Sequence, residues 1–174
     1  MLTLEGSPVW VYDIEVFSNY FLATFYNGEK WKSYESPSEL SSLLHSKNLV
    51  LAGFNNLKYD DAIINYIGDN PDIYLDEIHA LSNQLIFNEH GEENFGIIYR
   101  KKCWRFSIDV FQILNAKGSL KEWECKFGLD KVAESPCDFS LPLDMNRVQE
   151  IRDYCKNDVE ATYKILKSNW RRVS

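Results

Sequence analysis

The chain has 174 residues, of which 45% are hydrophobic and 14% aromatic, and this is enough apolar material for one domain with a substantial core. Its formal net charge of −7 argues against a protein that grips long duplex DNA through the phosphates. The sequence shows no run of 18 apolar residues, no signal peptide and no low-complexity stretch. We therefore expect a single cytoplasmic domain over residues 1–174 that has no membrane partner.

The first predicted element is a strand over residues 9–16, where β-branched and aromatic side chains dominate and burial near the centre of a sheet is favoured. Side chains alternate along a strand, so Asp13 and Glu15 project from the same face. Two neighbouring acids repel each other and are costly to desolvate unless a cation lies between them. A divalent metal resolves that conflict. The alternative is an exposed strand end with solvated acids, which an isolated D-x-E pattern would favour.

Two further strands are predicted at residues 21–26 and 30–34, on either side of an Asn-Gly pair at 27–28. That pair strongly indicates a tight hairpin turn. With the strand at 9–16, these segments predict an antiparallel meander. A short helix near residues 37–46 follows.

The apolar run at residues 48–54 predicts a buried strand that ends in a polar loop, and a helix is predicted near 60–68. Asp60 lies at or near the start of this helix, where the ordinary role of an aspartate is to cap the backbone N–H groups. Its neighbour Asp61 is an equal candidate for the cap or for a functional acid.

The remaining predicted elements are, in order, a helix around 75–87, a strand near 105–111, a helix over 119–127 and a long final helix that begins after residue 144. The final helix is predicted from a stripe of residues at helical spacing, namely Val148, Ile151, Cys155, Val159, Tyr163 and Leu166. Tyr154 and Asp158 are four residues apart on the final helix and therefore share one of its faces. The phenol can then lie beside whatever the carboxylate binds. Taken alone, this segment favours the alternative in which Asp158 is a surface acid and Tyr154 a core aromatic.

Three short motifs occur in order along the chain: D-x-E at residues 13–15, N-x-x-[F/Y]-D at 56–60 and Y-x-x-x-D at 154–158. Together they make the chain resemble the DEDD superfamily of 3′–5′ exonucleases, in its tyrosine-containing branch. The likeness is closest to the proofreading exonuclease domains of phage DNA polymerases. Those domains carry a fourth motif, [S/T]-L-x-x-hydrophobic, which contacts single-stranded DNA and is matched here at 119–123.

The resemblance implies an α/β, ribonuclease H-like fold. Its mixed five-stranded sheet has an antiparallel 1-2-3 meander plus parallel strands and is flanked by helices, which agrees with the order of the predicted elements. No polymerase palm fits within 174 residues, so we expect either a standalone nuclease or the proofreading domain of a phage-type DNA polymerase. The implied setting is the cytoplasm of a bacterial or phage-infected host cell, with a polymerase module or other replication proteins as partners.

The resemblance also implies a two-metal site that hydrolyses phosphodiesters at the 3′ end of single-stranded DNA. The implied ligands of two Mg²⁺ or Mn²⁺ ions are Asp13, Glu15, Asp60 and Asp158, and Tyr154 completes the catalytic set by orienting the attacking water as a neutral hydroxyl. Family spacing favours Asp60 over Asp61. The chain offers no arrangement of Cys and His residues suited to zinc.

The predicted substrate contacts are Asn56 and Tyr59, the latter because an aromatic face stacks on any base, together with Ser119 and Leu120, which the resemblance implies through the fourth motif. For Leu120, packing in the core is an equal alternative. RNA is an alternative substrate, because ribonuclease D-like enzymes share the same five-residue site. A non-catalytic nucleic-acid-binding or docking domain is a third possibility, although such a domain has no physical reason to keep mutually repelling acids together.

Overall fold

The computed structural model describes residues 1–45, 49–87, 106–115, 117–129 and 132–173 and shows an α/β fold built on a mixed sheet. Its strands are β1 (Thr3–Leu4), β2 (Ser7–Val16), β3 (Phe21–Tyr26), β4 (Trp31–Tyr34), β5 (Val50–Gly53) and β6 (Phe106–Asp109). Its helices are α1 (Pro37–Leu44), α2 (Asp60–Asp69), α3 (Leu75–Phe87), α5 (Val110–Ile113), α6 (Leu120–Lys126) and α7 (Val148–Ser168), with 3₁₀ turns η1 (Asn56–Lys58), η2 (Met145–Arg147) and η3 (Trp170–Arg172). None of the described helices is both long enough and apolar enough to cross a membrane.

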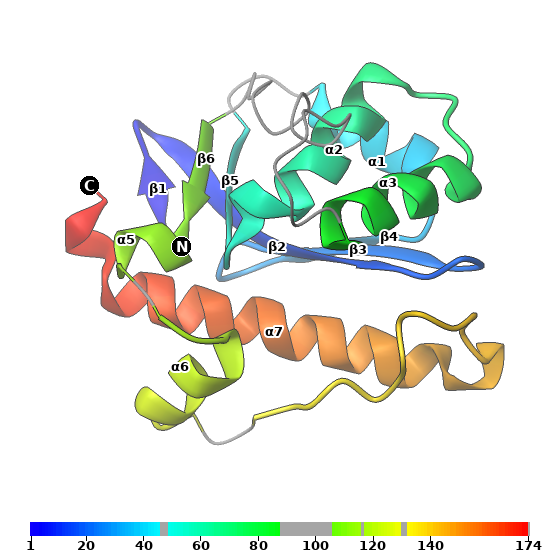
Figure 1. Cartoon of the computed structure of the whole chain (residues 1–174). Helices are drawn as coiled ribbons and strands as arrows, with labels where there is room; N and C mark the ends of the chain where they lie inside the picture. The colour runs from blue at the N-terminus through cyan, green and yellow to red at the C-terminus, as the bar shows by residue number, and fades with distance from the viewer. Residues whose placement is uncertain (46–48, 88–105, 116, 130–131, 174) are drawn as a thin grey trace.

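The sheet is sandwiched between helices. Helices α1, α2 and α3 lie on one face, and α7 runs along the other (Figure 1). The strand order is β4-β3-β2-β5-β6, with β1 paired to the start of β2. The pairs β2–β3 and β3–β4 are antiparallel, whereas β2–β5 and β5–β6 are parallel. The predicted α/β class and the predicted meander followed by parallel strands are therefore confirmed. The two-residue strand β1 was not predicted, because it is too short to produce a periodic pattern.

The hairpin turn between β3 and β4 forms where the Asn-Gly pair predicted it. The side-chain oxygen of Asn27 accepts hydrogen bonds from the backbone N–H groups of Glu29 at 3.0 Å and Lys30 at 2.8 Å. Gly28 has a φ of 96°, a conformation that side-chain-bearing residues rarely adopt. This turn closes the meander and sets the register of β3 against β4.

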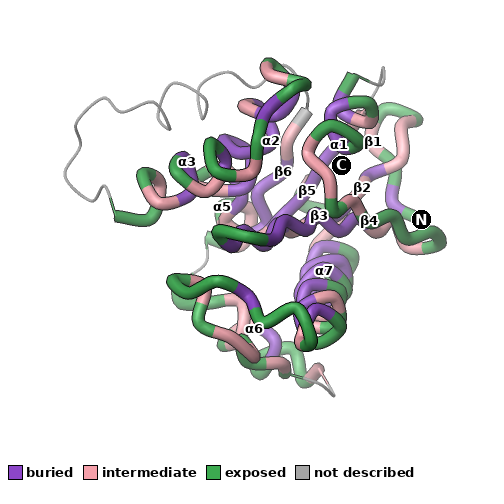
Figure 2. The backbone as a smooth tube through the Cα atoms, turned by 90° about the vertical axis from the view of Figure 1, so that its right-hand side faces the viewer, coloured by how far each residue is buried: buried purple, intermediate pink, exposed green. Residues whose placement is uncertain are grey.

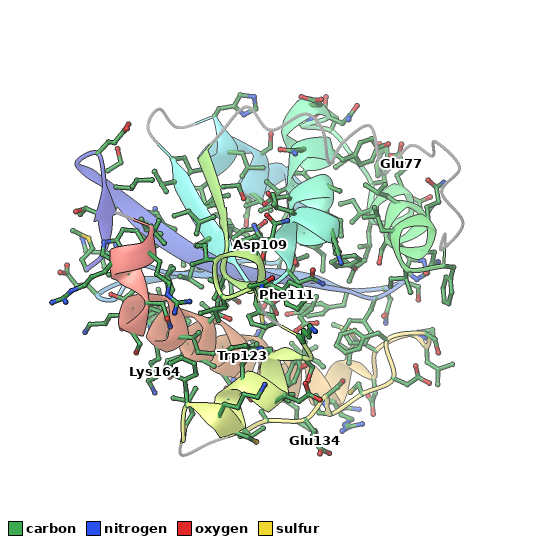
Figure 3. All side chains as sticks on the ribbon, turned by 60° about the vertical axis from the view of Figure 1, so that its left-hand side comes forward. Glu77, Asp109, Phe111, Trp123, Glu134 and Lys164 are labelled. Carbon is green, nitrogen blue, oxygen red and sulfur yellow. The ribbon has the colours of Figure 1, made fainter. Side chains whose placement is uncertain are left out.

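The predicted end of the strand before α5 is wrong. The strand predicted near residues 105–111 ends at Asp109 and is followed directly by the short helix α5. The carboxylate of Asp109 accepts a hydrogen bond from the backbone N–H of Phe111 at 3.0 Å and so caps α5 (Figure 3). It also accepts the backbone N–H of Asn55 at 2.9 Å. Asp109 therefore holds the loop after β5 as well as ending β6.

The final helix also begins differently from the prediction. The 3₁₀ turn η2 follows Asp144, whose carboxylate accepts the backbone N–H of Asn146 at 3.0 Å, and α7 begins only at Val148. The predicted apolar stripe of this helix is confirmed as buried; its members are Val148, Ile151, Cys155, Val159, Tyr163 and Leu166. Figure 2 shows this buried side of α7 turned toward the sheet.

Alternation along β2 distributes its side chains between the two helical layers. Tyr12 and Ile14 pack with the residues of α1, α2 and α3, whereas Val9 and Val11 pack with those of α7. Helix α2 is anchored by Ile63 and its neighbours Ile64 and Ile67, which are fully buried. Burial of one such side chain contributes about 1.5–3 kcal/mol. The start of α2 is consequently held firmly against β2.

Candidate metal centre

The acids of β2 meet on the face of the sheet that α7 covers. Asp13 is partly exposed, and Glu15 is buried at 6% exposure. The two carboxyl groups share a hydrogen bond. Ligand atoms of Asp13, Glu15 and Cys155 all lie within 4.8 Å of one another. Strand alternation thus produces a local cluster that α7 closes from the outside.

Helix α7 adds Asp158 and Tyr154 to this cluster. Asp158 is buried at 7% exposure, and the hydroxyl of Tyr154, one helical turn away, donates a hydrogen bond to it. The charge of Asp158 acts on both Asp13 and Glu15 and raises their pKa values. The long helix therefore brings its acid within close electrostatic range of the two acids on the strand.

Asp60 enters the cluster from α2, of which it is the first residue. Its carboxyl group is buried at 7% exposure and accepts a backbone hydrogen bond from Ile14, the residue between the two acids of β2. Burial raises its pKa well above the ordinary value, and the charges of Asp13 and Asp61 add to the rise. The structure thus places four acids from three separate elements close enough for their charges to act on one another.

The electrostatics of the cluster make ionisation of its acids costly. Burial, followed by the charge of Asp158, raises the pKa of Asp13 from 3.8 to about 7. Burial and the charge of Asp13 raise the pKa of Glu15 well above its ordinary value. Ionising all of these groups together is costly because they are desolvated and repel one another, and a divalent cation would remove that cost. Carboxylate oxygens are the donors that Mg²⁺ and Mn²⁺ prefer, so the residues present fit such ions.

Asp61 belongs to a separate, buried hydrogen-bond network. It receives hydrogen bonds from the hydroxyl of Tyr12, from the side-chain amide of Asn56 at 3.1 Å and from the hydroxyl of Ser107 at 2.6 Å. Asp61 itself is 2% exposed. Both of its oxygens are occupied by these donors, so Asp60 is the aspartate of the pair that belongs to the cluster.

Three of the four residues predicted to contact substrate make structural contacts within the protein. Asn56 is fully buried, and its amide donates to Asp61 and, at 2.9 Å, to Ser107, so it presents no surface to a nucleotide here. Ser119 is the N-cap of α6 and forms a capping box with Glu122. Leu120 is partly buried against the core beside α7, which agrees with the packing alternative.

Tyr59, the fourth, lines a cavity that opens beside the cluster. Its hydroxyl is hydrogen-bonded to that of Ser82 at 2.6 Å. The cavity has a volume of about 500 Å³ and lies between the end of β2, helix α3 and the segment 137–140; its lining includes Glu15, Val16, Tyr59, Ser82, Phe87 and Phe139. This volume suits a ligand of nucleoside size, and the aromatic lining is typical of small-molecule sites.

Sequence reasoning missed Lys121 and Glu124 on α6. The ammonium of Lys121 is ion-paired with Asp158, lies 3.7 Å from a carboxylate oxygen of Glu124 and sits 4.8 Å from the centre of the Tyr154 ring. Helix α6 packs beside α7 through Trp123 (Figure 3). The spacing i, i+3 places residues 121 and 124 on one face of a helix, but no local pattern reveals that this face meets Asp158.

The thiol of Cys155 is part of the cluster without being a suitable ligand. It is fully buried, and its sulfur lies 3.7 Å from a carboxylate oxygen of Asp13. Burial and the charge of Asp13 raise the pKa of the thiol well above its ordinary value, so it stays protonated and donates weakly to the acid. A neutral thiol is a poor ligand for Mg²⁺ or Mn²⁺. We therefore regard it as packing at the floor of the site.

Comparisons of the chain with protein-family models, with curated proteins and with solved structures gave no significant match. The functional conclusion therefore depends on the geometry and chemistry of the site.

Proposed function

We propose that the protein is a metal-dependent 3′–5′ exonuclease that hydrolyses the terminal phosphodiester of single-stranded DNA. The observation that carries this proposal is the convergence of Asp13, Glu15, Asp60 and Asp158, with the hydroxyl of Tyr154 hydrogen-bonded to the last of them. These are the residues through which the chain resembles the tyrosine branch of the DEDD superfamily. The observed strand order also supports the proposal that the α/β fold is ribonuclease H-like.

Each residue has a distinct role in this proposal. Asp13, Glu15, Asp60 and Asp158 would hold two Mg²⁺ or Mn²⁺ ions, which, when bound, would lower the pKa of a water and neutralise charge on the phosphate. Burial, followed by the charge of Asp158, raises the pKa of Tyr154 above its ordinary value. The phenol therefore stays protonated at neutral pH and orients the attacking water by hydrogen bonding.

The cavity beside Glu15 supplies the place for the terminal nucleoside. The rings of Tyr59 and Phe139 line this cavity. Aromatic faces stack on a base whatever its identity, and each stacked base contributes about 1–3 kcal/mol to binding. An acidic protein of net charge −7 is suited to gripping a few terminal nucleotides through cations and stacking, and poorly suited to a long run of phosphates. The proposed substrate is thus a frayed or single-stranded 3′ end.

A cleavage assay with end-labelled strands tests the proposal. Single-stranded DNA and RNA, labelled at either the 3′ or the 5′ end, are incubated with the protein and Mg²⁺ or Mn²⁺. We expect stepwise loss from the 3′ end of DNA, abolished by chelator and by Asp13→Ala. The matched control is Asp153→Ala, which removes an exposed acid from α7, and this variant should keep full activity.

Each other outcome has a definite meaning. Stepwise cleavage of RNA in preference to DNA would change the proposed substrate class and leave the chemistry in place. No cleavage by the wild type, or equal cleavage by the wild type and Asp13→Ala, would contradict the proposed function.

A further inference from the structure

Lys121 places a positive charge inside the acid cluster. Its ammonium is ion-paired with Asp158 and lies over the ring of Tyr154, although only 25% of its side chain is exposed. It thus contacts both residues that α7 contributes to the site. In this position it neutralises part of the charge that a metal ion would otherwise neutralise.

A second carboxylate lies within reach of the same ammonium. Glu124 is fully buried on α6, and one of its oxygens is 3.7 Å from the nitrogen of Lys121. The other oxygen has no hydrogen-bond partner among the described residues. The remaining contact of this carboxylate is a long hydrogen bond of 3.5 Å from the side-chain amide of Asn157. A buried carboxylate with an unsatisfied oxygen is costly unless a cation approaches it more closely.

We propose that Lys121 is a tethered cation that holds Asp158 while the site is metal-free, and that it transfers to Glu124 when a divalent ion binds Asp158. The inference rests on the metal site of the proposed function. An ammonium and a divalent cation repel each other, so binding of a divalent ion at Asp158 favours movement of the ammonium to another carboxylate. The transfer is short, because Lys121 already lies between the two acids and its side chain has several rotatable bonds.

The exchange has two consequences for the site. The metal-free cluster is protected from the full repulsion of its acids, since one cation is always present. The divalent ion must compete with Lys121 for Asp158, so its affinity is lower than the carboxylates alone would give. Departure of Lys121 would also uncover Tyr154, over whose ring it lies.

Binding of Mn²⁺, followed by electron paramagnetic resonance of the free ion, tests the exchange independently of activity. Lys121→Met removes the competing charge and should tighten binding of Mn²⁺ by about tenfold, which corresponds to about 1.4 kcal/mol. Lys126→Met is the matched control. It removes the same charge from the same helix, but its ammonium lies over Trp123 at 4.6 Å, and it should change binding by less than about twofold.

A double-mutant cycle tests the role of Glu124. Glu124→Gln should weaken Mn²⁺ binding several-fold in the wild-type background, because the ammonium of Lys121 then loses the second carboxylate and competes more strongly for Asp158. It should have a much smaller effect in the Lys121→Met background. Equal effects in both backgrounds would mean that Glu124 acts only through its own charge, and would overturn the transfer.

The failure of this inference is distinguishable from failure of the proposed function. If the wild type binds no Mn²⁺, the metal site itself is contradicted. If the wild type binds Mn²⁺ and Lys121→Met leaves the affinity unchanged or lowers it, only the inference on Lys121 is overturned. Lys121→Gln provides a second uncharged variant with the same expectation if Lys121→Met does not fold, as judged by circular dichroism.

Discussion

Asp61 accepts a hydrogen bond from the hydroxyl of Tyr12, and this buried pair separates the roles of two consecutive aspartates. Tyr12 points into the layer of α1, α2 and α3, whereas the next residue, Asp13, points toward α7. The hydrogen bond between Tyr12 and Asp61 therefore fixes the start of α2 against β2. Asp60, the residue before Asp61, faces the acid cluster.

Asparagine substitutions at these two positions should have opposite effects. Asp61→Asn places an amide N–H₂ among the donors of Tyr12, Asn56 and Ser107, and we expect it to lower the free energy of unfolding by about 2–4 kcal/mol. Asp60→Asn removes one of the repelling acids and should leave the metal-free stability equal or higher while abolishing metal-dependent cleavage. Urea unfolding in chelator and the cleavage assay measure both effects. Greater destabilisation by Asp60→Asn would contradict the separation of roles.

The stability of the metal-free protein should depend on Asp13 in a pH-specific way. The pKa of Asp13 is raised from 3.8 to about 7 in the folded protein, so the folded state retains a proton that the unfolded chain releases. The stabilising contribution of protonated Asp13 to the free energy of unfolding is fully present below pH 4 and is lost as the pH rises through about 7. One pKa unit corresponds to about 1.4 kcal/mol.

Asp13→Asn mimics the protonated acid, and its stability relative to the wild type should therefore increase between pH 5 and pH 7.5 by about 1–3 kcal/mol. Urea unfolding in chelator at the two pH values checks this. Addition of Mg²⁺ at pH 7.5 should stabilise the wild type more than the variant. If the difference in free energy of unfolding between Asp13→Asn and the wild type does not change with pH, Asp13 does not hold a proton in the folded state.

Removal of the phenolic hydroxyl should impair the chemical step alone. Tyr154→Phe keeps the ring and removes the hydrogen bond to Asp158. We expect kcat to fall by about 100-fold, with Mn²⁺ binding and thermal stability nearly unchanged, because in the proposed mechanism the hydroxyl orients water and does not hold the ion. Tyr74→Phe, at a position that is 74% exposed, is the control and should have no effect. Loss of Mn²⁺ binding in Tyr154→Phe would instead indicate that the phenol is a ligand.

The aromatic cavity should determine KM. Phe139 lines the cavity and stacks on Phe17 with ring centres 4.6 Å apart. Phe139→Ala should raise KM for single-stranded DNA by about fivefold or more, because stacking on a base contributes about 1–3 kcal/mol. Leu141→Ala removes an exposed side chain two residues away and should leave KM unchanged. Steady-state kinetics of the wild type and both variants check this. A KM for Phe139→Ala equal to that of the wild type would contradict the proposed position of the nucleoside.

Much of the fold was predictable because it follows from local sequence patterns. The β-branched and aromatic side chains of residues 9–16 predicted the central strand, and the helical stripe from Val148 to Leu166 predicted the final helix and its buried face. The end of β6 was mispredicted because Asp109 caps α5 and also binds the loop after β5. An apolar run alone does not reveal that a carboxylate within it will end the strand.

The sequence by itself determined which acids are available and which of them share a face, since Asp13 and Glu15 are two residues apart on a strand and Tyr154 and Asp158 four apart on a helix. Only the tertiary structure decided between Asp60 and Asp61, buried Asn56, and brought Lys121 to Asp158. Tyr12 and Asp61 are 49 residues apart, and Lys121 and Asp158 are 37 apart. Such contacts arise from the packing of whole elements against the sheet, and no periodicity within one element encodes them.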